Sequence, residues 1–117
     1  MSVTDRFLIL AAGLAGAAGV GLSAAAAHAG GAFTGTAASF LLMHAPVLLA
    51  IGLIGRSRIL RIAGFILLIG VTLFSGDLIA RDFLGTRLFP LAAPAGGTLL
   101  IAGWLAVALS AFVGRNR

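Results

Sequence analysis

Four long stretches of apolar residues divide this chain, and they constrain its fold more than any other feature. They cover residues 7–27, 37–54, 62–80 and 98–113. A helix needs about 20 mainly apolar residues to cross the hydrocarbon core of a bilayer. Lipid cannot satisfy free backbone donors and acceptors, so each stretch is expected to be helical. The sequence therefore predicts a single all-α membrane domain, with four transmembrane helices in a compact bundle.

Composition excludes the main alternatives to a membrane fold. Apolar residues make up 61% of the 117 residues, and only 9% are charged, against roughly 25% in soluble domains. Disorder needs the opposite balance of low hydrophobicity and high charge. The apolar stretches also lack the alternation of a transmembrane β-barrel. Residues 23–27 resemble a signal-peptidase site, but the first stretch is longer than a signal core, which favours a retained helix.

The arginines predict how the chain is threaded through the membrane. An even number of crossings puts six of them on one side, and only Arg81 and Arg87 on the other. The positive-inside rule then places both termini in the cytoplasm. The six arginines, which we expect to contact anionic lipid headgroups rather than nucleic acid, are Arg6, Arg56, Arg58, Arg61, Arg115 and Arg117.

Small residues indicate where the helices approach one another. Gly13, Ala17 and Gly21 recur every four residues in the first stretch, beside a second ridge that includes Ala12. Close van der Waals contact between small residues drives helix association in lipid. The repeat fits either a dimerisation face or packing inside the bundle, and we favour the second, with this helix at the centre. Two further glycines, Gly76 and Gly103, are also expected to pack against helices.

Three ionisable residues within the spans, His28, His44 and Asp77, are costly in lipid and need partners. The predicted threading puts all three in the outer half of the bundle, with Trp104 at a depth similar to that of His44. Asp77 precedes Arg81 by four positions, which permits an ion pair within one helix. The favoured interpretation is a structural polar cluster; the alternative is a proton or ion site. No local pair of ligands supports a metal site.

The residues that are missing exclude several chemistries. The chain has no cysteine and no tyrosine, and its sequence contains neither lysine nor glutamate. Thiolate chemistry, a Schiff base and a Walker-type phosphate loop are therefore ruled out. No serine lies in the sequence context of a nucleophile. We expect a protein that is not an enzyme and that carries no cofactor.

Five short phrases follow one another along the chain: Ala27-His28-Ala29, His44-Ala45, Leu73-Phe74-Ser75-Gly76-Asp77-Leu78, Pro94-Ala95-Gly96-Gly97 and Gly103-Trp104. In their order and spacing they resemble the domain of unknown function 423 (DUF423) family of small bacterial inner-membrane proteins. The resemblance implies a four-helix protein of the bacterial inner membrane and no defined activity. The chain differs from the family pattern at Ser39-Phe40 and at Ile79, where polar or tyrosine residues are common.

Two hypotheses for function follow. The first is a non-catalytic structural or accessory subunit that packs against lipids, a larger membrane complex or a second copy of itself. The alternative is a small proton-coupled transporter or ion-binding protein that uses Asp77 with His28 and His44. A carrier site is expected near the bilayer midplane, and Asp77 is predicted closer to the outer surface.

Overall fold

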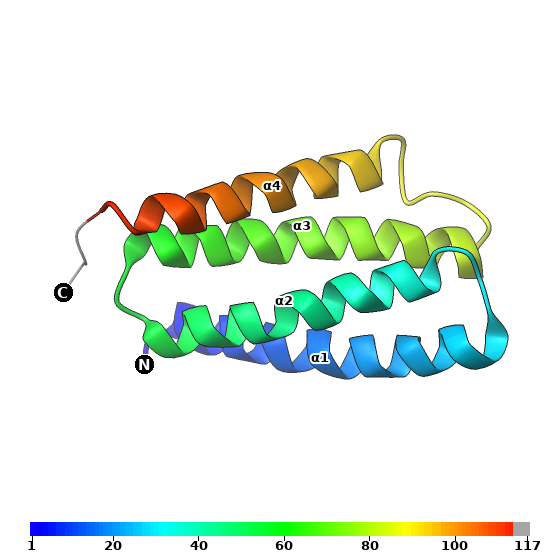
Figure 1. The fold of residues 1–117 in the computed structure, drawn as a ribbon, viewed down its shortest axis with the longest axis horizontal. Helices are drawn as coiled ribbons and strands as arrows, with labels where there is room; N and C mark the ends of the chain where they lie inside the picture. The colour runs from blue at the N-terminus through cyan, green and yellow to red at the C-terminus, as the bar shows by residue number, and fades with distance from the viewer. Residues whose placement is uncertain (114–117) are drawn as a thin grey trace.

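A computed structural model describes residues 1–113 of this protein as four α-helices, with no strand in that range. The helices lie nearly parallel, and the start of α1, the α2–α3 loop and the end of α4 all meet at one end of the molecule (Figure 1). We call this the arginine-rich end, because Arg6, Arg56, Arg58 and Arg61 belong to it. The helices are α1 (Val3–Ala29), α2 (Thr34–Ile54), α3 (Arg58–Phe83) and α4 (Ala92–Ser110).

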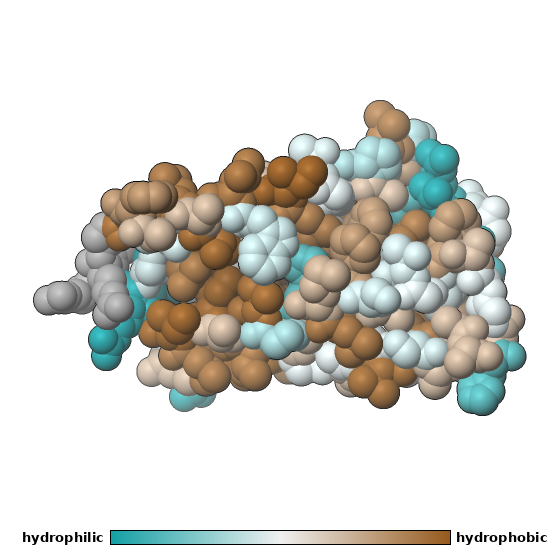
Figure 2. Space-filling model, in the orientation of Figure 1, coloured by the Kyte–Doolittle hydropathy of each residue, from teal (hydrophilic) through white to brown (hydrophobic). Residues whose placement is uncertain are grey.

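All four helices are long and apolar enough to cross a membrane, which confirms the predicted fold class. Hydrophobic residues cover most of the visible flank of the bundle, whereas the most hydrophilic ones gather mainly near its two ends (Figure 2). This distribution suits a molecule whose middle is surrounded by lipid and whose ends contact headgroups and water. Cytoplasmic termini remain a prediction. Two arginines used for that prediction, Arg115 and Arg117, lie outside the described residues.

The two middle helices, not the first, form the centre of the bundle. α2 packs against α1 and α3, and α3 packs against α2 and α4, while α1 packs mainly against α2. In the most apolar stretch of each helix, 44% of the residues are buried in α3 but only 17% in α1. The expectation that α1 occupies the centre is therefore wrong. The core consists of Leu8, Ala12, Leu48, Ile51, Leu67, Val71 and Leu100.

The predicted packing face of α1 also needs correction. Gly13, Ala17 and Gly21 are exposed, and a Cβ added to Gly13 or Gly21 would meet nothing within 4 Å. These three residues form what we call the exposed stripe of α1. The neighbouring ridge packs inward instead, through Leu8, Ala12, Ala15 and Gly19. Both ridges consist largely of small residues, so their composition does not reveal which one faces α2.

Helices α3 and α4 approach each other closely through their backbones. A Cβ added to Gly96 would lie 2.6 Å from the backbone nitrogen of Phe74 and 2.8 Å from the carbonyl oxygen of Gly70. A Cβ on Gly103 would lie 2.7 Å from Leu67, and one on Gly76 would lie 3.4 Å from Leu88. At Gly96 only a residue without a side chain allows the two backbones to meet this closely, whereas the contact at Gly76 is an ordinary van der Waals distance.

Helix α4 begins earlier than predicted, at Ala92 rather than residue 98. Pro94 is in its first turn, where proline removes no hydrogen bond that the helix needs. Gly96 lies inside the helix, because its close approach to α3 offsets the weak helix propensity of glycine.

Helix α3, at the other end of the α3–α4 loop, continues to Phe83. Asp77 therefore lies six residues from the helix end, about 9 Å along the axis, and deeper than predicted.

Candidate functional site

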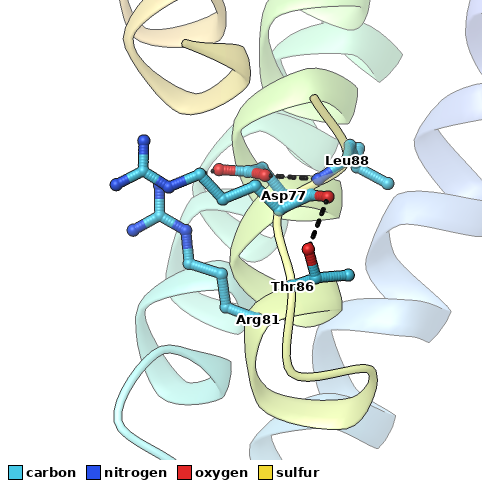
Figure 3. Close-up of polar contacts among 5 residues, drawn as sticks. Asp77, Arg81, Thr86 and Leu88 are labelled. Atoms are coloured by element: carbon cyan, nitrogen blue, oxygen red, sulfur yellow. Dashed lines mark hydrogen bonds and ion pairs between the residues drawn. The ribbon is translucent and has the colours of Figure 1, made fainter. Parts of the chain in front are cut away.

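The predicted pair between Asp77 and Arg81 forms, and Asp77 is completely buried. Its Oδ2 accepts a hydrogen bond from Arg81 Nη2 at 2.9 Å, and its Oδ1 accepts one from the backbone N–H of Leu88 at 2.8 Å. Figure 3 shows the Leu88 N–H directed at the Asp77 carboxylate. The Arg81 guanidinium also lies 5.3 Å from the centre of the Phe33 ring. Asp77 thus holds the α3–α4 loop against α3. Arg81 in turn connects Asp77 to Phe33, the residue before α2.

Asp82 has a role that the sequence did not reveal: it caps α2. Its Oδ2 accepts hydrogen bonds from the backbone N–H groups of Phe33 and Thr34, at 2.9 and 2.6 Å, and from the Thr34 hydroxyl at 2.5 Å. Helix α2 has no cap from its own first residues, and exposed N–H groups at a helix start favour a carboxylate. The missing local cap at the start of α2 is the one sequence signal that could have pointed to this contact.

His44 and Trp104 form the second polar pair, between α2 and α4. Trp104 Nε1 donates a hydrogen bond to His44 Nε2 at 3.2 Å. The other ring nitrogen, Nδ1, lies 2.7 Å from the carbonyl oxygen of Phe40. These partners assign the neutral imidazole with its proton on Nδ1, because Nε2 must accept and a carbonyl can only accept. Both ring nitrogens therefore have partners within the protein, and the side chain of His44 is only 1% exposed.

An apolar pocket of about 340 Å³ lies beside this pair. Phe40, Phe74, Ile101 and Trp104 contribute to its wall, and His44 is its one ionisable member. With both nitrogens of His44 occupied, the pocket presents no free polar group from that residue. A small apolar molecule or a lipid chain fits this lining better than an ion does.

The structure does not bring the predicted cluster together as one site. Asp77 pairs with Arg81 and His44 pairs with Trp104, but no hydrogen bond within residues 1–113 connects the two pairs. His28 is exposed near the end of α1 and joins neither pair. No group of three metal-ligating side chains occurs among the described residues. Ser75 adds one further polar contact, from α3 to the carbonyl oxygen of Ala37 in α2, at 3.3 Å.

Four membrane-length helices connected by buried polar contacts define a small integral membrane protein. The chain belongs to the DUF423 family: the model of that family, described as "Protein of unknown function (DUF423)", matches residues 15–97. This confirms the resemblance inferred from the sequence. The matched range contains most of α1, all of α2 and α3, and the start of α4.

Curated relatives carry the name UPF0382 membrane protein. One from Staphylococcus haemolyticus is 35% identical over 78 residues, which cover 65% of this chain and 64% of the relative. One from Haemophilus influenzae is 30% identical over 83 residues, or 69% of this chain and 67% of the relative. The match thus spans less than two thirds of the staphylococcal protein. No solved structure matches the chain.

Proposed function

We propose that this protein is a non-catalytic accessory subunit of the bacterial inner membrane, with both termini in the cytoplasm. In this role it packs through the exposed stripe of α1 against a helix of a larger membrane protein complex. The observation that carries the proposal is the position of this stripe. Gly13, Ala17 and Gly21 are exposed, and the bundle packs α1 through its other face.

Small residues determine where helices associate in lipid. A helix gains little by burying apolar surface against another helix, since lipid tails are equally apolar. Small residues instead allow two backbones to come close enough for strong van der Waals contact. Within this chain, Gly96 and Gly70 already act in this way. The exposed stripe offers the same kind of surface to a helix from another chain.

The polar groups support a structural role. Both oxygens of Asp77 and both ring nitrogens of His44 have partners inside the protein. A carrier needs ionisable groups that can exchange a proton or an ion with a pathway near the midplane. The transporter hypothesis combined Asp77 with His28 and His44, and this geometry gives it no common site.

Copurification with a matched pair of variants tests the accessory role. Gly21→Leu adds bulk to the exposed stripe and leaves the fold intact, because nothing lies within 4 Å of the added Cβ. Leu105→Ala changes a residue of α4 that is 65% exposed and serves as the control. After extraction in mild detergent, the wild type and the control should retain the same partner membrane protein, and Gly21→Leu should lose it. Isolation of the wild type as a lone chain, or only as a homodimer, would contradict the proposal.

A further inference from the structure

The arginine-rich end contains a buried carboxylate that is only partly satisfied. Asp5 is 5% exposed in the first turn of α1. Its Oδ2 accepts a hydrogen bond from the backbone N–H of Ser2 at 3.3 Å, but its Oδ1 has no hydrogen-bond partner among residues 1–113. A buried acceptor without a donor is costly. Arg61, which lies in the same cavity wall, does not donate to Oδ1.

Asp5 forms part of the wall of a cavity of about 510 Å³, which also includes the last turn of α2. The final turn of a helix leaves carbonyl oxygens without partners inside the helix and carries a partial negative charge. Gly55 ends α2 with a φ of +61°, and a Cβ there would lie 2.9 Å from Asp5 Oδ2. Glycine at this position therefore lets the carboxylate lie against the helix end. The result is a wall of acceptors that favours a cationic hydrogen-bond donor.

The cavity also has a cationic side, formed by Arg61. Arg61 Nη1 donates to the carbonyl oxygen of Gly55 at 3.0 Å, which fixes the side chain at the rim and leaves further guanidinium N–H groups available. Five N–H groups in a planar fork suit the oxygens of a phosphate. The cavity thus places acceptors for a cation and donors for an anion next to each other.

An apolar groove of about 330 Å³ adjoins the cavity and shares Thr4 and Arg61 with it. Phe65, Ile66 and Ile69 form much of its wall along α3, and Arg58 lies at its edge. A polar cavity at a helix end that continues into an apolar groove along the membrane-spanning surface has the shape and polarity of a phospholipid.

We propose that this end of the bundle binds a phospholipid whose headgroup carries a primary ammonium, of the phosphatidylethanolamine class. The ammonium lies at Asp5 and the carbonyl oxygens of the α2 terminus, the phosphate at Arg61 and Arg58, and one acyl chain in the groove along α3. A choline headgroup fits poorly because its quaternary nitrogen has no N–H to donate. An anionic headgroup without an ammonium leaves Asp5 unpaired. This selection goes beyond the general attraction of arginines for anionic lipid.

Lipid retention measured by native mass spectrometry tests the proposal. The purified protein is released from nanodiscs that contain equal amounts of phosphatidylethanolamine, phosphatidylcholine and phosphatidylglycerol. A charge-assisted hydrogen bond corresponds to about a tenfold preference, so the wild type should retain phosphatidylethanolamine about tenfold over phosphatidylcholine. Asp5→Asn should abolish that preference. Arg61→Gln should lower the retention of every phospholipid.

Arg56→Gln is the matched control, because it removes one positive charge from the same end but lies outside both the cavity and the groove. It should leave the preference unchanged. A second series needs no variant: nanodiscs with N-methylated phosphatidylethanolamines should show retention that falls as each N–H is replaced. This series remains decisive even if Asp5→Asn fails to fold. Equal retention of the ethanolamine and choline lipids by the wild type, or a preference for phosphatidylglycerol, would overturn the proposal.

Discussion

Gly96→Ala should destabilise the bundle, because it forces two backbones apart. The new Cβ would lie 2.6 Å from the backbone nitrogen of Phe74, so α3 and α4 must separate by about 0.8 Å to reach the 3.4 Å of an ordinary contact. Backbone atoms cannot rotate away as a flexible side chain can. Overpacking of this kind costs about 1–3 kcal/mol, against a gain of up to about 1 kcal/mol in helix propensity.

Gly97→Ala is the control at the next position. Its Cβ would have Phe74 Cδ1 as its nearest neighbour, at 4.0 Å, so the change should be neutral or slightly stabilising. The free energy of unfolding can be measured by titration with SDS in mixed micelles. Trp104 is the one tryptophan of the chain, and its contact with His44 makes its fluorescence report the docking of α4. Equal unfolding free energies for the two variants would refute the argument about backbone contact.

Three further predictions concern the polar residues and the threading. Asp77→Asn should lower the free energy of unfolding by about 3 kcal/mol, because it leaves Arg81 without its buried partner; the same SDS titration measures this. Asp82→Ala should cost about 1 kcal/mol and speed hydrogen exchange at the Thr34 amide, whereas protection like that of the wild type would exclude the cap. The chain has no cysteine, so Ser57→Cys in the α2–α3 loop and Thr86→Cys in the α3–α4 loop can each be labelled in intact cells. Only the cysteine at position 86 should react with an impermeant reagent, and the reverse pattern would invert the threading.

Local patterns in the sequence were sufficient to predict the helices. Each span depends on the hydropathy of its own residues, and the Asp77–Arg81 pair depends on a separation of four positions in one helix. Both kinds of information are present in a short window of sequence. The start of α4 was less predictable, because Gly96 is a weak helix former and its close contact with α3 involves residues distant in the sequence.

Long-range contacts were harder to predict. Asp82 caps the start of α2, which lies 48 residues away in the sequence. The residues around Asp82 contain no sign that α2 is its partner. The inward face of α1 was missed because its two ridges are similarly small and apolar. In a soluble protein the polar side of a helix would mark the exposed face, but lipid removes that distinction. His44 and Trp104 were expected at a similar depth, yet nothing in the sequence indicated that they are hydrogen-bonded.

The two proposals use different parts of α1, and this makes them separable. Gly21 and Asp5 are sixteen residues apart, or roughly 24 Å along a helix, so a change at one should not reach the other through direct contact. Gly21→Leu should therefore remove the partner without altering lipid preference, and Asp5→Asn should do the opposite. If either variant changes both properties, α1 itself has shifted against α2. α1 is the least buried helix of the bundle, and a shift of this kind would mean that the bound phospholipid sets how α1 presents its exposed stripe.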